Sequence, residues 1–278
     1  MGAPAALVWL DGRLVPEAEA SVSAFDHGFI VGDGVFETLR TYGGRPFAVR
    51  RHLERLARSA RGLGLALPDP AGVAEAIDAV LEAAALPEAR VRVTVTSGPG
   101  PLGSARGAAG PTVMVAAAPL DPLPGTAAVI TVPWARNERG ALAGLKTTSY
   151  AENALALARA HAAGADEAVF ANTRGELCEG TGTNVAVAVD GRLVTPPLSS
   201  GCLAGVTRML LLEVGGVVEA PLALEALAGA DEAALLSSTR AVQAIASVDG
   251  RRLPSAPGPL SERAAEAFAA LVGRGLDP

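Results

Sequence analysis

The chain has 278 residues, of which half are apolar and 4% aromatic, and it carries a formal net charge of −6 at pH 7. This acidic balance argues against a nucleic-acid or anionic-membrane surface, because such surfaces need clustered lysines or arginines. The sequence shows no signal-peptide pattern and no apolar run of about 18 residues, so we expect a cytoplasmic protein. We expect its partners to be small molecules.

The two cysteines, Cys178 and Cys202, are too few for a disulfide framework. Neither has metal-ligand spacing with the three histidines, so no metal site is expected. We expect both thiols to be buried and to pack as small apolar groups.

The first 118 residues predict an N-terminal α/β domain. Residues 6–10 and 13–15, joined by Asp11-Gly12, have the pattern of a β-hairpin. A glycine-rich turn then leads into a half-buried strand at 35–42. An apolar stripe predicts a helix over 52–65, and Asp69-Pro70 is typical of the start of a second helix. Strands are expected at 90–96 and 112–118, separated by a glycine-rich loop at 97–110 that could act as a lid.

A proline-rich stretch at 119–124 predicts an interdomain linker, followed by a C-terminal domain over 125–278. In that domain we expect strands at 127–132, 166–171, 185–189 and 192–195, and helices near 151–163, 205–214 and 260–273. A last short hairpin turns at Asp249-Gly250. The pattern indicates an α/β or α+β protein with two lobes, and it places Lys146 near the start of the second lobe.

Lys146 is the only lysine in the chain, and every other basic residue apart from the histidines is an arginine. A chain that uses arginine wherever a positive charge suffices has a chemical reason to keep one amine. The pKa of lysine falls readily on burial, and the neutral amine can form a Schiff base with a carbonyl. The sequence therefore suggests pyridoxal phosphate chemistry at Lys146, for which an acid and a phosphate site are also needed.

Both of these partners have candidates in the second half of the chain. Glu176 and Glu179 are the candidate acids beside the pyridine nitrogen, and small residues follow Glu179, which leave room for a flat ring. Residues 201–208 form a small-residue turn that opens an apolar helix, whose N-terminal N–H groups suit a phosphate.

The order of these signals resembles the class IV aminotransferases, the fold-type IV pyridoxal phosphate enzymes. That family includes D-amino-acid and branched-chain aminotransferases and aminodeoxychorismate lyase. The similarity spans almost the whole chain. In the first half it rests on residues 26–40, which include Gly-Asp-Gly-Val-Phe-Glu-Thr-Leu-Arg from residue 32, and on residues 52–56. In the second half it rests on Lys146 with Tyr150, Glu179-Gly-Thr-Gly-Thr-Asn184, residues 195–197, Leu203-Ala-Gly-Val-Thr-Arg208 and Ser237-Ser-Thr-Arg240. It implies a small N-terminal α/β lobe and a larger C-terminal pseudobarrel lobe.

The resemblance also implies a role for each matching residue. Lys146 would form the Schiff base with the cofactor and then move protons as a general acid and base. Tyr150 would donate to the phenolate oxygen, Glu179 would pair with the pyridine nitrogen, and Leu203 would lie against the ring face. The phosphate would be held by basic, hydroxyl and backbone N–H donors: Arg55, Gly205, Val206, Thr207, Ser238 and Thr239.

The substrate α-carboxylate needs a cation, for which Arg40, Arg106 and Arg240 are the candidates, with Phe36 beside the substrate. Because Arg240 would make the pocket basic, we expect a D-amino acid such as D-alanine or D-glutamate as donor and a 2-oxo acid as acceptor. Two alternatives stay open: a 4-amino-4-deoxychorismate lyase that forms 4-aminobenzoate and pyruvate, and a branched-chain L-amino-acid aminotransferase. The resemblance also implies a homodimer in which the neighbouring subunit completes the pocket.

Overall fold

The structure, a computed structural model, describes residues 7–66 and 68–278. In this part of the chain two compact units are present. Unit 1 contains the residues up to Asp121, together with Leu145–Tyr150 and Leu276–Pro278, and unit 2 contains Pro122–Gly144 and Ala151–Gly275. The first change of unit falls inside the expected linker. The segment that carries Lys146 belongs to unit 1, whereas the sequence places it in the C-terminal lobe.

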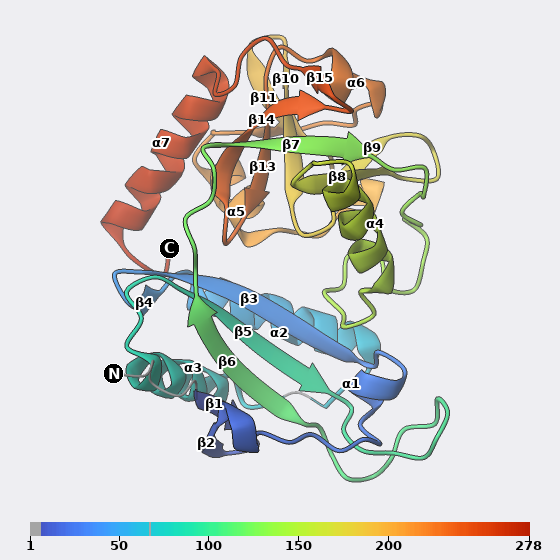
Figure 1. Cartoon of the computed structure of the whole chain (residues 1–278), viewed down its shortest axis with the longest axis vertical. Coiled ribbons are helices and arrows are strands. Elements are labelled where there is room, and N and C mark those ends of the chain that lie inside the picture. The colour runs from blue at the N-terminus through green and yellow to red at the C-terminus, as the bar shows by residue number, and fades with distance from the viewer. Residues whose placement is uncertain (1–6, 67) are drawn as a thin grey trace. The chain divides into compact units, whose positions relative to one another are not determined.

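Unit 1 is built on an antiparallel sheet (Figure 1). Its described residues form six strands in the order β2-β1-β6-β5-β3-β4: β1 (Leu7–Leu10), β2 (Arg13–Pro16), β3 (Gly34–Tyr42), β4 (Arg45–Pro46), β5 (Ala89–Thr96) and β6 (Val113–Pro119). The expected hairpin is confirmed, with Asp11 and Gly12 both at positive φ, as a two-residue turn requires. Ala6, at which we expected the first strand to begin, lies outside the described residues.

Two helices, α2 (Val49–Leu63) and α3 (Pro70–Ala84), pack on one face of this sheet (Figure 1). The Asp69 side chain accepts hydrogen bonds from the N–H groups of Ala71 and Gly72, which confirms the expected helix start. The core beneath the helices contains alternate residues of the strands, such as Val91, Val93 and Val95. The residues between them therefore lie on the opposite face of the sheet. Two shorter elements, η1 (Glu17–Glu19) and α1 (His27–Ile30), precede β3.

Unit 2 contains a larger mixed sheet. In residues 122–144 and 151–275, all of which are described, nine strands follow the order β12-β11-β10-β13-β14-β7-β8-β9, with β15 beside β14: β7 (Thr126–Thr131), β8 (Glu167–Ala171), β9 (Leu177–Gly180), β10 (Asn184–Val189), β11 (Arg192–Thr195), β12 (Val218–Glu219), β13 (Ala233–Ser237), β14 (Ala241–Val248) and β15 (Arg251–Arg252). The β14–β15 turn confirms the hairpin expected at Asp249-Gly250. The sequence did not predict β9, β12 or β13.

The helices of unit 2 are α4 (Ala151–Ala162), α5 (Val206–Glu213), α6 (Glu225–Gly229) and α7 (Pro259–Arg274), with the short η2 (Leu198–Ser200) before α5. Helix α4 packs on β8 around the buried Phe170, and α7 packs on β14 (Figure 1). The three helices expected in this half of the chain are thus confirmed. Among the described residues, no helix combines the length and the apolar character that crossing a membrane requires.

Candidate active site

Lys146 is fixed in unit 1 by backbone hydrogen bonds on both sides. The N–H of Phe36 donates to the Lys146 carbonyl at 3.0 Å, and the N–H of Thr148 donates to the Gly34 carbonyl at 2.8 Å. The Lys146 N–H donates to the Ser59 hydroxyl of α2 at 3.0 Å. This short segment therefore extends the edge of β3, which explains why it belongs to unit 1.

Two aromatic side chains lie beside the lysine amine and Arg92 packs on one of them, and we call Phe36, Arg92, Lys146 and Tyr150 the Lys146 group. Lys146 Nζ lies 4.2 Å from the centroid of the Phe36 ring and 5.9 Å from that of Tyr150. The Phe36 and Tyr150 rings meet edge to face with centroids 5.2 Å apart. Arg92 Cζ lies 3.8 Å from the Phe36 centroid. Two cations thus share one buried aromatic ring.

Arg92 was not among the three arginines selected from the sequence. It lies on β5, where Arg92 pairs with Thr38 and Thr94 pairs with Phe36 in the register with β3. Alternation along both strands places Arg92 and Phe36 on the face that α2 and α3 do not cover. Burial lowers the pKa of Arg92, the nearby Tyr150 opposes this shift, and a guanidinium stays ionised at neutral pH. Only the strand register identifies this residue, and no local motif marks it.

The three predicted arginines each bind other protein groups. Arg40 donates to Glu88 at 3.0 and 3.2 Å. Arg106 donates to both carboxylate oxygens of Asp33 and to two carbonyls at the end of α2. Arg240 donates to the Gln243 side chain at 2.5 Å and to a backbone carbonyl at 3.2 Å.

Arg55 lies in a buried cluster with Glu37 and His52. Its Nε and Nη2 donate to the two carboxylate oxygens of Glu37 at 2.7 and 2.6 Å, and His52 Nδ1 lies 2.7 Å from Glu37 Oε2. Burial alone would raise the pKa of Glu37, but Arg55 and His52 lower it far below its ordinary value. The carboxylate therefore stays ionised and fixes the plane of the Arg55 guanidinium.

Glu179 lies on β9 in unit 2, where its carboxylate accepts a backbone hydrogen bond and forms an ion pair. The N–H of Leu203 donates to Oε2 at 2.8 Å, and Arg136 Nε lies 3.4 Å from Oε1. The Arg136 guanidinium itself stacks on the Phe170 ring, with Cζ 4.1 Å from the centroid. The alternative acid, Glu176, instead binds Arg174 and Asn172, which lower its pKa. Of the two acids, Glu179 is held by the Leu203 N–H, which lies just before α5, and by the ion pair with Arg136.

The start of α5 is suited to an anion. Its N-cap is Gly205, which supplies no side-chain oxygen to the first turn, and Val206 and Thr207 follow with buried side chains. A Cβ at Gly205 would lie 2.0 Å from the Asn184 side-chain oxygen, so only glycine fits there. Asn184 also donates to the Leu203 carbonyl at 2.8 Å, which fixes the turn. Ser238 and Thr239 lie in the turn between β13 and β14.

Comparison with known proteins identifies what this chain is similar to. A family model described as "Amino-transferase class IV" matches residues 34–248. The chain is 37% identical over 256 residues to a provisionally named branched-chain-amino-acid aminotransferase of Methanocaldococcus jannaschii, covering 88% of each protein. It is 30% identical over 298 residues to the bifunctional aminodeoxychorismate lyase / D-amino acid transaminase of Mycobacterium tuberculosis, covering 96% of this chain and 97% of the relative.

A solved structure supports the same assignment. The branched-chain aminotransferase from the thermophilic archaeon Thermoproteus uzoniensis, solved with norvaline, superimposes with a TM-score of 0.89 at 30% identity, covering 96% of this chain and 95% of the other. This likeness confirms the expected two-lobed fold-type IV architecture. The matched residues 34–248 include the Lys146 group and Glu179.

Proposed function

Because the chain belongs to the class IV aminotransferase family, whose members use pyridoxal phosphate, we propose that it is a transaminase for an aliphatic α-amino acid and that Arg92 binds the substrate carboxylate. One observation carries this proposal: Lys146 Nζ and Arg92 Cζ lie 4.2 and 3.8 Å from the same Phe36 centroid. An amino acid placed at this ring would present its α-carbon to the amine and its carboxylate to the guanidinium.

The side chains present fit the cofactor. A lysine amine beside two aromatic rings suits an aldehyde, and a carboxylate held by a backbone N–H and an arginine at Glu179 suits a pyridine nitrogen. The uncapped first turn of α5 and the buried Thr207 hydroxyl suit a phosphate ester. When bound, pyridoxal phosphate supplies an aldehyde that condenses with amines and a ring that withdraws electrons from the substrate α-carbon.

Each residue would then have a limited task. The Lys146 amine takes a proton from the substrate α-carbon and returns a proton later in the reaction. Tyr150 donates to the phenolate oxygen, and the Phe36 ring excludes water from the amine. Leu203 would pack against the ring face. The remaining predicted set would hold the phosphate: Arg55, Gly205, Val206, Thr207, Ser238 and Thr239.

The structure also bears on the choice of amino donor. The expectation of a D-amino acid depended on Arg240 as a carboxylate clamp, and Arg240 donates instead to Gln243 and to the Asp166 carbonyl. The Phe36 ring beside Lys146 is apolar, which favours an aliphatic substrate side chain. The 37% identity with a branched-chain type of relative supports the same choice.

A second candidate function is D-amino-acid transamination combined with aminodeoxychorismate lyase activity. The observation in its favour is the bifunctional relative from Mycobacterium tuberculosis, which this chain matches along almost its whole length. Elimination of pyruvate would use the same lysine as proton carrier, so the residues of the Lys146 group fit both reactions.

A substrate panel tests the proposal. The purified enzyme is assayed with L-leucine, L-valine, D-alanine, D-glutamate and aminodeoxychorismate, with 2-oxoglutarate as amino acceptor for the four amino acids. We expect the highest kcat/KM with a branched-chain L-amino acid. Faster turnover of a D-amino acid, or release of pyruvate from aminodeoxychorismate as the main activity, would establish the second candidate function instead.

The carboxylate site is tested with two arginines of one strand. Arg92→Ala should lower kcat/KM for the amino acid by about 10- to 150-fold, the effect of losing one hydrogen bond to a charged group. Arg90 lies two residues earlier on the same face of β5 and is exposed, so Arg90→Ala is the matched control. Equal effects of the two changes would refute the role of Arg92, and a large effect of Arg40→Ala, Arg106→Ala or Arg240→Ala would restore the earlier assignment.

We infer in addition that the enzyme is a homodimer. Large apolar side chains are exposed on and beside α1 and in the 97–110 loop, among them Phe25, Phe29 and Leu102, and Phe29 and Leu102 are each 78% exposed. A second copy of the chain would cover them. Light scattering of the purified protein should give twice the mass of the chain, and a monomer at micromolar concentration would contradict the inference.

A further inference from the structure

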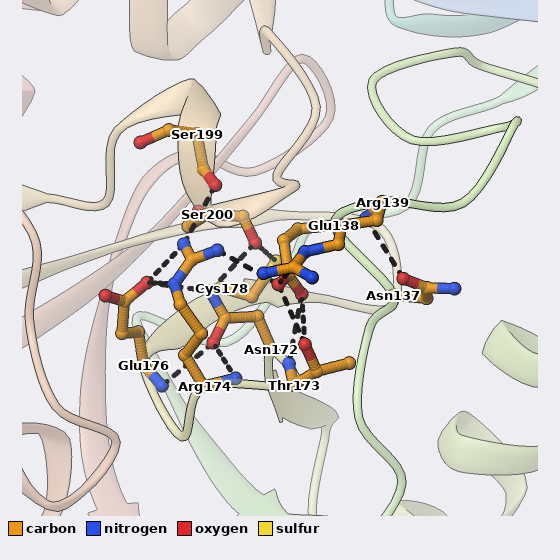
Figure 2. Close-up of polar contacts among 10 residues, drawn as sticks. All are labelled: Asn137, Glu138, Arg139, Asn172, Thr173, Arg174, Glu176, Cys178, Ser199 and Ser200. Atoms are coloured by element: carbon orange, nitrogen blue, oxygen red, sulfur yellow. Dashed lines mark hydrogen bonds and ion pairs between the residues drawn. The ribbon is translucent and has the colours of Figure 1, made fainter.

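A polar cluster in unit 2 joins three segments that lie far apart in the sequence (Figure 2). We call Glu138, Asn172, Thr173, Arg174 and Glu176 the Glu138 cluster. Glu138 follows β7, the other four residues form the turn between β8 and β9, and the third segment is η2 with Gly201. None of these residues is among those proposed above to bind the cofactor or the substrate.

Arg174 is bonded to all three segments, as Figure 2 shows. Its Nη1 donates to Glu138 Oε1 at 2.9 Å, and its Nη2 donates to Glu176 Oε2 at 2.6 Å and to the Ser199 carbonyl at 3.0 Å. Glu138 also accepts from the Thr173 hydroxyl at 2.8 Å and from the Thr173 N–H at 3.1 Å. One guanidinium thus ties the loop after β7 to η2 through the β8–β9 turn.

The third segment packs closely on both of the others. The Asn172 side chain donates to the Ser200 carbonyl at 3.3 Å. Gly201 has a φ of +92°, and a Cβ there would lie 2.9 Å from both Cα and Cβ of Glu138. The backbone after η2 therefore packs directly on Glu138, with no space for a side chain between them.

The Glu138 carboxylate is buried, with 3% of the side chain exposed. The Thr173 hydroxyl, backbone N–H donors and the Arg174 charge lower its pKa to about 2. The carboxylate is therefore ionised throughout the neutral range and binds Arg174 as a charge-assisted partner.

The hydrogen-bond donor and the ion-pair partner of Glu179 come from the segments that this cluster ties together. Arg136 lies two residues before Glu138, and Leu203 lies two residues after Gly201. We propose that Arg174 is a positioning residue that keeps Arg136 and the Leu203 N–H on the Glu179 carboxylate. This proposal rests on the proposed role of Glu179 at the cofactor nitrogen. Arg174 acts through backbone placement and touches neither substrate nor cofactor.

The test compares two arginines that lie near the same Glu138 carboxylate. Arg174→Gln removes the bonds to Glu138, Glu176 and Ser199. Arg139→Gln is the matched control, because Arg139 Nε lies 3.9 Å from Glu138 Oε1 and its side chain is 82% exposed. Amide hydrogen exchange of residues 198–205 is measured in the cofactor-free proteins, so that this readout does not depend on turnover. We expect at least tenfold faster exchange at Leu203 in Arg174→Gln and no change in Arg139→Gln.

Activity is then measured in the holoenzyme. Arg174→Gln should lower kcat by about 10- to 100-fold, since a displacement of about 1 Å within an active site can cost about 100-fold in rate. The KM for the amino acid should change little. Thr173→Val removes only the hydroxyl bond to Glu138 and should shift both readouts in the same direction by less. It serves as the second variant if Arg174→Gln does not fold.

A double-mutant cycle separates this proposal from the proposed function. In a Glu179→Gln background, Arg174→Gln should cost no further kcat, because its effect passes through Glu179. Equal losses of kcat in both backgrounds, or exchange at Leu203 like that of wild type, would overturn the positioning role. Full activity of Glu179→Gln alone would overturn the proposed role of Glu179. In that case hydrogen exchange of the Leu203 amide would still test whether Arg174 positions this backbone segment.

Discussion

Glutamine in place of Glu37 removes one charge from the buried cluster beneath α2. Glu37 is fully buried, and its two oxygens accept from Arg55 at 2.7 and 2.6 Å, while His52 lies 2.7 Å from one of them. Glutamine has the same size but no charge. The Arg55 guanidinium would then remain buried without a counter-charge, which is a more costly state than the intact pair.

The size of the effect follows from this burial. Removing one partner of a buried ion pair costs about 3 to 5 kcal/mol of unfolding free energy. In a chain of this length each 1 kcal/mol shifts Tm by about 2 to 4 °C, so Glu37→Gln should lower Tm by about 6 to 20 °C. Glu88→Gln is the matched control, since Glu88 pairs with Arg40 at the surface, where both side chains are partly exposed. Its cost should stay below about 1 kcal/mol.

The assay is thermal unfolding of the cofactor-free proteins at pH 7, followed by circular dichroism. The cofactor is left out because a bound ligand would add its own stabilisation. A midpoint for Glu37→Gln that is no lower than that for Glu88→Gln would refute the description of the Arg55 cluster as a buried pair.

The loss of stability caused by Glu37→Gln should depend on pH. In the folded protein the pKa of Glu37 is held far below 4.5, so the carboxylate stabilises the fold above pH 4.5 and this contribution declines as pH falls further. Burial also lowers the pKa of His52 below 6.5, so the unfolded chain binds this proton more tightly than the folded protein does. His52 therefore makes the fold less stable as pH falls below 6.5. The difference between wild type and Glu37→Gln should therefore narrow below pH 4.5, and a constant difference from pH 7 to pH 3 would contradict this reasoning.

Two further predictions concern unit 2. Glu179→Gln should lower kcat by about 100- to 1,000-fold, because a neutral amide cannot stabilise the charge of a protonated ring. Glu176→Gln should remain active. The reverse result in steady-state assays would make Glu176 the acid. Burial raises the pKa of Cys202 to about 11 and that of Cys178 even further, so neither thiol should react with iodoacetamide at about pH 8 in the folded protein. Rapid labelling of either cysteine, detected by peptide mass spectrometry, would contradict their burial.

Much of the fold follows from local signals in the sequence. The Asp11-Gly12 and Asp249-Gly250 turns and the Asp69 cap are formed by residues next to one another, and all three are present in the structure. Strand β9 was missed because it is short and has no apolar alternation, and it is stabilised by pairing with β8. Local pattern cannot reveal such pairing.

The site was predicted less completely, for a related reason. Lys146 and Glu179 stand in recognisable motifs, whereas Arg92 comes to lie on the Phe36 ring only through the register of β3 with β5. The pairing of Arg55 with Glu37 likewise needs the helix–sheet contact of α2 with β3. Arg40, Arg106 and Arg240 carry the right charge, but each binds another side chain. Arg40 and Arg106 pair with acids distant in sequence, and Arg240 donates to Gln243, three residues along the chain.

Covalent attachment of the cofactor to Lys146 can be measured by intact-protein mass spectrometry after borohydride reduction. Because the chain has no second lysine, wild type should gain the mass of one pyridoxyl phosphate group, while Lys146→Ala should gain none and keep the circular dichroism spectrum of wild type. Lys146→Arg is the control that retains the positive charge, and it should gain no mass either. A reduced adduct of the same mass on Lys146→Ala, or wild-type turnover by that variant, would contradict the assignment of Lys146.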